Sequence, residues 1–244
     1  MTPHSALTGI EFVISKESLR IKDMFNSLAK NYDVANDVLS FGMHRIWKKA
    51  LVSKIPKEGA DALDCATGTG DIAILIKKHS PKTKLTAIDF SEKMIEQAPP
   101  KAKKEGIEDI QFLVADILKL PFANNSFDHI TISFGIRNVE NLLSAIAEFE
   151  RILKPKGTLH VLEFGQPQGP AWSKVYSSYH RSVLPVVGGL ITGNIKAYSY
   201  LNKSSEEFPS GESFIKQFPP TVWKAVETTP LLGGIAYIYR IQKQ

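Results

Sequence analysis

The stretch LDCATGTGD, residues 63–71, decides the fold of this chain of 244 residues. It begins in a compact apolar run at 62–66, which has the length of a buried strand, and it continues into an amphipathic segment at 71–78, which we predict to be a helix. The turn Thr67-Gly68-Thr69-Gly70 lies between them, and glycine there permits a positive φ and a close approach of a ligand to the backbone. This order is typical of a ligand-binding loop in an α/β sheet.

Strands and helices alternate outward from this loop. The further strands that we expect are residues 84–88, 111–115, 129–133 and 158–164, with helices at 91–104 and 141–153. Such alternation predicts a parallel sheet that is covered by helices on both faces. The β-rich end at 234–241 has no helix after it, so we expect an antiparallel final strand.

We therefore expect an α/β fold in one domain with four parts. They are an N-terminal helical cap at 1–58 (with helices at 18–30 and 44–54), a ligand-binding core at 59–164, an insertion at 165–205 and a segment at 206–244 that completes the sheet.

Composition excludes several classes of protein. With 43% hydrophobic residues the chain can bury a core, and its single cysteine, Cys65, excludes a disulfide framework and a multi-cysteine metal site, so we expect no metal. No apolar run reaches the roughly 18 residues that span a bilayer, and no secretory signal precedes the cap, so the expected location is the cytoplasm. The net charge of +5 is too small and too dispersed to predict a nucleic-acid partner.

Charges around the glycine turn indicate the type of ligand. The dinucleotide fingerprint G-x-G-x-x-G is absent, and two acids, Asp64 and Asp71, flank the turn instead. They would repel a pyrophosphate, whereas they suit a ligand that carries a sulfonium and an ammonium group. The sequence therefore predicts S-adenosylmethionine as the cofactor.

The ends of the following strands carry groups that suit the rest of this cofactor. Asp89 ends the second strand and can accept hydrogen bonds from both ribose hydroxyls. Asp116 ends the third and can accept from the adenine amino group, with the Ile117 backbone beside the ring, and Ser133 ends the fourth. Because the carboxyl ends of parallel strands lie along one edge, we expect these residues to form one site.

A more specific signal comes from four segments, residues 25–48, 64–71, 130–139 and 153–164. In these segments the chain resembles the ubiquinone/menaquinone biosynthesis C-methyltransferase family, which belongs to the class I S-adenosylmethionine-dependent methyltransferases. The resemblance implies a Rossmann-like, mostly parallel sheet of seven strands, the last antiparallel, flanked by helices and covered by the N-terminal helical cap. It also implies that Thr69 and Ser133 contact the cofactor. The full predicted cofactor site is Asp64, Gly68, Thr69, Gly70, Asp89, Phe90, Asp116, Ile117 and Ser133.

The reaction implied by the resemblance is methylation of a ring carbon of a polyprenylated quinol in menaquinone or ubiquinone biosynthesis, such as demethylmenaquinol to menaquinol. The ring carbon becomes nucleophilic when the neighbouring hydroxyl loses its proton. We expect Arg137 to hold that oxygen as its negative charge grows and Asn138 to hydrogen-bond to it; a structural ion pair is the alternative for Arg137. Tyr32 and Asp33 complete the predicted catalytic set, and Asp33 and His44 are the candidate bases.

The insertion is the expected site for the polyprenyl tail. An apolar stripe at helical spacing is formed by Trp172, Tyr176, Tyr179 and Val183, with Lys174 and Arg181 on the same helix. The stripe is either ordinary core or the wall of a lid that contacts the inner face of a membrane. Peripheral membrane contact and a homodimer both remain open.

Two other functions remain open. One is a class I methyltransferase that acts on a different hydrophobic small molecule, such as a sterol-like or polyketide acceptor. The other is a non-catalytic subunit that binds S-adenosylmethionine in a quinone-biosynthesis complex.

Overall fold

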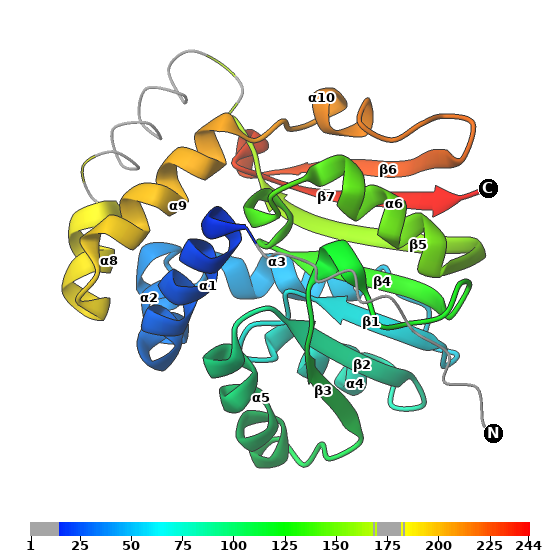
Figure 1. Ribbon diagram of the computed structural model, residues 1–244, viewed down its shortest axis with the longest axis horizontal. Helices are drawn as coiled ribbons and strands as arrows, with labels where there is room; N and C mark the ends of the chain where they lie inside the picture. The colour runs from blue at the N-terminus through cyan, green and yellow to red at the C-terminus, as the bar shows by residue number, and fades with distance from the viewer. Residues whose placement is uncertain (1–14, 168, 170–181, 183) are drawn as a thin grey trace, which may run out of the picture.

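A twisted sheet of seven strands forms the centre of the molecule (Figure 1). The structure, a computed structural model, describes residues 15–167, 169, 182 and 184–244. In this part of the chain the strands are β1 Asp61–Cys65, β2 Lys84–Asp89, β3 Ile110–Val114, β4 Phe127–Ser133, β5 Leu153–Phe164, β6 Trp223–Leu231 and β7 Ala236–Lys243. Their order across the sheet is β3-β2-β1-β4-β5-β7-β6.

Strand directions confirm the predicted fold class. Neighbouring strands from β3 through β5 are parallel, and β7 is antiparallel to both β5 and β6. The sequence pattern located six of the seven strands. It missed β6, because this edge strand is mostly exposed and lacks the alternation of apolar and polar residues that marks a half-buried strand.

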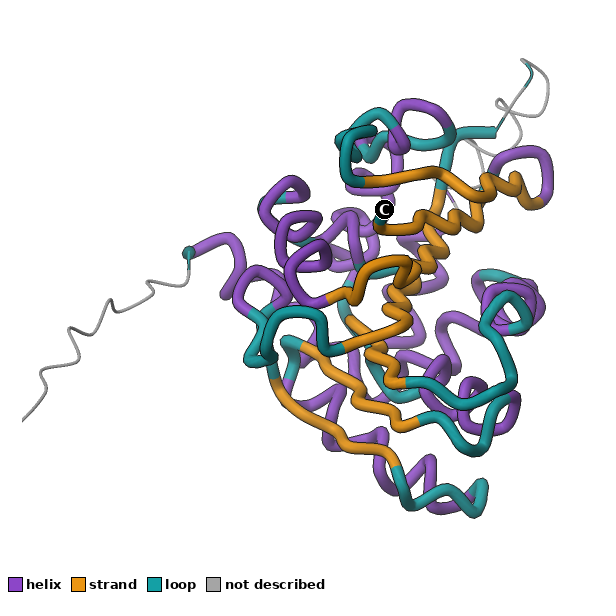
Figure 2. The backbone as a smooth tube through the Cα atoms, turned by 90° about the vertical axis from the view of Figure 1, so that its right-hand side faces the viewer, coloured by secondary structure: helices purple, strands orange, loops and turns teal. Residues whose placement is uncertain are grey.

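Helices cover both faces of the sheet (Figure 2). The described α-helices are α1 Lys16–Leu28, α2 Tyr32–Leu39, α3 Met43–Val52, α4 Asp71–His79, α5 Glu92–Lys104, α6 Leu142–Ile152, α8 Leu184–Thr192, α9 Ile195–Glu207 and α10 Glu212–Ile215. Successive residues of β1 point to opposite faces. Ala62 therefore packs in the cluster with α3 and α4, whereas Leu63 packs in the cluster with α6 and α10.

Local sequence explains where these helices begin. The Ser91 hydroxyl accepts from the Met94 backbone N–H at the start of α5, and the Asn141 side chain caps α6 in the same way. Gly70 precedes α4 with φ +88°, and a Cβ built there would lie 3.0 Å from the Ala98 Cβ. Glycine at this position lets the loop after β1 pack directly against α5.

The helical cap combines two distant parts of the chain. Leu28 and Ala35 of the N-terminal helices share a buried cluster with Met94 of α5 and with Ala197 and Tyr198 of α9, which lies in the predicted insertion. The predicted stripe residues Trp172, Tyr176, Tyr179 and Val183, and the basic residues Lys174 and Arg181 expected on the same helix, lie outside the described residues. No helix in the described ranges combines the length and the apolar character that crossing a bilayer requires.

Candidate active site

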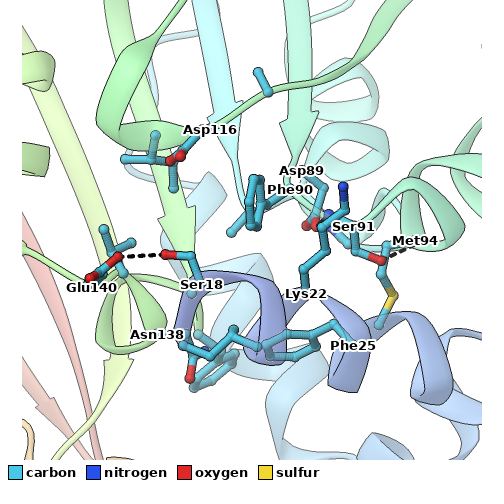
Figure 3. Close-up of a pocket in the computed structure, with 18 of the residues that line it drawn as sticks. Ser18, Lys22, Phe25, Asp89, Phe90, Ser91, Met94, Asp116, Asn138 and Glu140 are labelled. Atoms are coloured by element: carbon cyan, nitrogen blue, oxygen red, sulfur yellow. Dashed lines mark hydrogen bonds between the residues drawn. The ribbon is translucent and has the colours of Figure 1, made fainter. Parts of the chain in front are cut away.

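Two adjoining cavities open at the carboxyl ends of the parallel strands. The first, shown in Figure 3, has an empty volume of about 830 Å³, and the second has one of about 1630 Å³. Five residues line both cavities: Tyr32, Ala66, Gly68, Ser133 and Phe134. The two cavities therefore meet where β1 and β4 end, below the start of α2.

Two strand-end carboxylates line the first cavity. Asp89 accepts hydrogen bonds from the backbone N–H groups of Gly68 (2.8 Å) and Ser91 (2.9 Å), and burial raises its pKa to about 6. Asp116 accepts from the Leu118 N–H at 2.9 Å. Backbone N–H groups hold both carboxylates in a fixed orientation, and the lone pairs that remain can accept hydrogen bonds from a ligand.

Two polar side-chain atoms of residues that line the first cavity lack partners. Ser133 Oγ and Asn138 Oδ1 are buried and make no hydrogen bond within the described part of the chain. Buried polar atoms in native proteins are nearly always paired. Their position indicates that a bound ligand with polar groups completes them.

Helix α1, which lies in the predicted N-terminal helical cap, covers the first cavity, although the sequence did not predict which of its residues line it. Its residues Ser18, Ile21, Lys22 and Phe25 line the cavity. At the start of α1, Ser15 and Ser18 each donate to Glu140 at 2.7 Å, and in the middle of the helix Lys22 pairs with Glu92 (Figure 3 labels Ser18, Lys22, Phe25 and Glu140). Glu140 lies more than a hundred residues from α1, so no local pattern announces this contact.

The second cavity is larger and mostly apolar. Its apolar lining includes Leu39, Phe41, Met43, Trp47, Ile72, Phe164, Leu201, Leu232 and Ile235. Its polar lining includes Asn36, His44, Lys48 and Arg137. These residues come from the cap, α4, the turn after β4, the end of β5, α9 and the turn before β7, so distant parts of the chain assemble this cavity.

Arg137 lies in the second cavity and also forms the structural ion pair that the sequence left open. Its Nη1 donates to Glu163 Oε1 (2.7 Å) and to the Phe134 carbonyl (2.8 Å), and the two side chains are 5% and 0% exposed. The Arg137 Nε has no partner among the described residues. The two roles are compatible, because Glu163 fixes the guanidinium at the cavity wall.

The charge argument from the glycine turn needs correction. Asp64 and Asp71 do not line the first cavity. Asp64 is buried and accepts from the hydroxyls of Thr67 and Thr131 at 2.6 Å each, and burial raises its pKa to about 7. Asp71 pairs with Lys48 and Lys101, which hold its pKa below the ordinary value although burial opposes them. Asp71 does line the second cavity, but both carboxylates are already paired within the protein, so neither is a free negative charge beside the first cavity.

Four other predicted residues are distributed differently from expectation. Thr69 lines the second cavity instead of the first, and its hydroxyl donates to Asp33 at 2.7 Å. Gly70 and Asp33 line neither cavity, and Asp33 is also paired with Lys101. Tyr32 lines both cavities, and burial raises the pKa of its hydroxyl. The predicted residues Phe90, Ile117, Asn138 and Gly68 do line the first cavity.

His44, the second candidate base, lines the second cavity. Its Nδ1 is 2.7 Å from Ser40 Oγ, and burial, with Lys48 nearby, lowers its pKa to about 4. The ring is therefore neutral at physiological pH.

Comparisons with known proteins agree with this geometry. The profile of the ubiE/COQ5 methyltransferase family matches residues 13–243. A relative from Bdellovibrio bacteriovorus, named ubiquinone/menaquinone biosynthesis C-methyltransferase UbiE, is 46% identical over 222 residues, covering 90% of this chain and 94% of that protein. A protein of the same name from Dinoroseobacter shibae is 38% identical over 221 residues, covering 90% and 88%.

Solved structures show the same fold at low identity. A SAM-dependent methyltransferase from Thermotoga maritima superposes with a TM-score of 0.65 at 19% identity, covering 92% of this chain and all of that one. The cyclase SpnF superposes with a TM-score of 0.69 at 13% identity, covering 93% and 96%. The fold is thus that of the class I methyltransferases, and with the family profile matching nearly its whole length, this chain belongs to the ubiE/COQ5 methyltransferase family.

Proposed function

We propose that this protein is an S-adenosylmethionine-dependent C-methyltransferase that methylates a ring carbon of a polyprenylated quinol in menaquinone or ubiquinone biosynthesis. The observation that carries the proposal is the pair of cavities that meet at Gly68 and Ser133, one lined by fixed polar groups and the other large and apolar. A methyl transfer needs two ligands in line across such a junction. The names of the curated relatives support the quinone class of acceptor.

The first cavity fits the cofactor in its chemistry. Asp89 is placed to accept from ribose hydroxyls and Asp116 to accept from the adenine amino group. Ser133 Oγ and Asn138 Oδ1, the unpartnered buried atoms, suit the amino-acid end of the molecule. When bound, S-adenosylmethionine supplies an electrophilic methyl group. We therefore assign Asn138 to the cofactor site and not, as the sequence suggested, to the oxygen of the acceptor.

The second cavity fits a quinol with an apolar tail. Its aromatic and aliphatic walls favour a prenylated ring, and Arg137 offers the cationic group beside Phe164. A ring carbon attacks only when a neighbouring hydroxyl becomes a phenolate, and a fixed guanidinium stabilises that charge as it forms. We propose that Arg137 holds the phenolate oxygen and that Glu163 keeps Arg137 in position.

Proton removal does not fall to Asp33, because Thr69 and Lys101 occupy its carboxylate. His44 is neutral and lines the second cavity, so it can accept a hydrogen bond from the quinol. Its low pKa makes it a weak base. We therefore propose that His44 orients the quinol oxygen and that the quinol hydroxyl has already given its proton to the buffer in bulk solvent, so that the acceptor binds beside Arg137 as the phenolate.

The test is a transfer assay with purified protein, isotope-labelled S-adenosylmethionine and three acceptors: a demethylated naphthoquinol, a demethylated benzoquinol and a sterol. Mass spectrometry of the product should place the label on a quinol ring carbon. Label on the sterol alone would support the other small-molecule acceptor class. Cofactor binding without transfer to any acceptor, together with failure to restore quinone synthesis in a strain that lacks this methyltransferase, would support a non-catalytic subunit.

A further inference from the structure

We propose that this protein docks on an anionic lipid bilayer through an apolar surface at the mouth of the second cavity. The docking surface consists of Val34, Val38, Phe41, Val186, Leu190 and Ile195. The docking itself is inferred from this surface, and only the idea that the acceptor arrives from the bilayer rests on the proposed function.

The docking surface spans two helices that lie side by side. Val34 and Val38 are one turn apart on α2, and Val186 and Leu190 are one turn apart on α8, with all four exposed. Helices α2 and α8 pack against each other at the edge of the molecule (Figure 1). The Asn31 side chain, just before α2, donates to the Ile191 carbonyl at 3.1 Å. Scattered apolar side chains on a surface are ordinary, but several on adjoining elements mark a contact site.

Phe41 shows that this exposure is held in place by the backbone. Its side chain is 82% exposed, and its φ of +49° is a rare value for a bulky residue. Leu232 has the same two features, with 51% exposure and φ +44°. Both residues line the second cavity. Strained backbone tends to persist where it serves function, and here it keeps two apolar side chains at the cavity mouth.

Charge around the docking surface favours anionic headgroups. Helix α8 carries no charged residue, and the two acids of α2, Asp33 and Asp37, are paired with Lys101 and Arg45. Two exposed cations lie at the margins: Lys30 is four residues before Val34, and Lys196 follows Ile195. An apolar surface with basic residues at its margin is the pattern of an interfacial helix on an anionic membrane.

The docking surface is continuous with the site. Phe41 belongs to both, so a prenyl chain that leaves the bilayer at Phe41 enters the apolar second cavity directly. Transfer through water would expose the whole chain, which the hydrophobic effect opposes. This step assumes a prenylated acceptor.

Docking is tested by co-sedimentation with phosphatidylcholine vesicles that contain or lack phosphatidylglycerol, without any quinol. The wild-type protein should bind the anionic vesicles. The double variant V186S/L190S should bind these vesicles roughly tenfold more weakly, because two apolar side chains no longer enter the interface. Leu143→Ser is the matched control, since Leu143 is 61% exposed on α6, outside the docking surface.

The charge contribution has its own pair of variants. K30E/K196E should lose binding to anionic vesicles, whereas Lys84→Glu, at the opposite end of the sheet, should not. Failure of the wild-type protein to bind anionic vesicles, or equal losses in the variants and their controls, would overturn the proposal. So would a wild-type dimer that V186S/L190S converts to a monomer without any vesicle binding, because a second copy would then cover the surface.

Activity separates this proposal from the proposed function. V186S/L190S should methylate a water-dispersed short-chain quinol at the wild-type rate but should lose kcat/KM on a long-chain quinol in anionic vesicles. Vesicle binding without methylation of any quinol would leave docking intact and contradict the proposed function. Methylation of the short-chain quinol without vesicle binding would support the proposed function and contradict docking.

Discussion

Arg137 and Glu163 have different roles at the wall of the second cavity. Glu163 compensates a charge that would be costly to bury, and it thereby lets Arg137 lie almost fully enclosed at the wall of the second cavity. The Arg137 Nε remains without a protein partner in the described structure, so the pair still has a donor for the acceptor oxygen.

Replacing Arg137 by Met should lower kcat about a hundredfold, because one fixed donor to the developing phenolate is lost. Affinity for S-adenosylhomocysteine, measured by calorimetry, should stay unchanged, since Arg137 does not line the first cavity. Arg137→Lys should remain impaired because an ammonium cannot reproduce the planar fork. A parallel loss of cofactor affinity would instead mean that Arg137 supports the whole site.

Glu163→Gln should lower the free energy of unfolding by about 3 kcal/mol, because it leaves a buried guanidinium without its counter-charge. Urea denaturation measures this loss. Glu148→Gln is the comparison: its ion pair with Arg151 is partly exposed, and breaking it should cost less than about 1 kcal/mol. Equal losses would show that burial does not set the strength of the Arg137 pair.

Asp89 should make cofactor affinity depend on pH. Its pKa is raised to about 6, so the carboxylate accepts hydrogen bonds fully above that pH and loses this capacity as pH falls through it. Calorimetric titration with S-adenosylhomocysteine should show weaker binding below about pH 6, approaching tenfold for each pH unit. Asp89→Asn should bind weakly at every pH, and a wild-type affinity that is flat from pH 5 to pH 8 would contradict the assigned role.

At the scale of elements, β4, β5 and β7 share a buried polar layer at a distance from the cavities. His160 of β5 lies opposite Arg240 of β7 and has its Nε2 3.3 Å from His129 Nδ1 of β4. Burial, with His129 and Arg240 nearby, holds the pKa of His160 well below its ordinary value. A protonated imidazole is therefore unfavourable in this layer of the folded protein.

Acid should destabilise the fold through His160. The unfolded chain takes up a proton near pH 6.5 while the folded chain does not, so stability is fully present above that pH and falls as pH drops below it. Asp64 and Asp89 act in the opposite direction, because their raised pKa values let the folded state hold protons longer. The measurement is therefore the difference between wild type and His160→Leu in urea denaturation from pH 5 to pH 8. The wild type should lose more stability toward pH 5, and parallel pH profiles would rule out His160 as the cause.

At the scale of the whole molecule, the cap assembles from segments that lie far apart in the sequence. Helices α1 and α2 pack with α5 and α9, and α1 closes the first cavity through Glu140 and Glu92. Because four residues of α1 line the first cavity, α1 should be the element most sensitive to cofactor occupancy.

Saturation with S-adenosylhomocysteine should slow hydrogen exchange in residues 16–28 while leaving β6, at the far edge, unchanged. Ligand at a hundred times its Kd should also raise the free energy of unfolding by about 2.7 kcal/mol. Lys22→Met together with Glu140→Gln should speed exchange in α1 without ligand, because the start and the middle of the helix lose their polar contacts. Protection spread evenly over the protein would argue against α1 as a cover.

Much of the fold was predictable because the relevant signals are local. Each of these signals depends on a few neighbouring residues: the apolar run before the glycine turn, the cap at Ser91, Asp89 at the end of β2 and Asp116 after β3. Asp89, Asp116, Ile117 and Ser133 came to one cavity because parallel strands end at a common edge.

The availability of each charge was not predictable, because it depends on partners far along the chain. Sequence alone placed Asp64 and Asp71 beside the ligand, but Thr131 satisfies one, and Lys48 and Lys101 neutralise the other. The whole sequence determined the order of strands, turns and helices, since periodicity and capping act over short range. Only the tertiary structure decided which polar groups remain free for a ligand and which helices enclose it, since burial and pairing are properties of the packed chain.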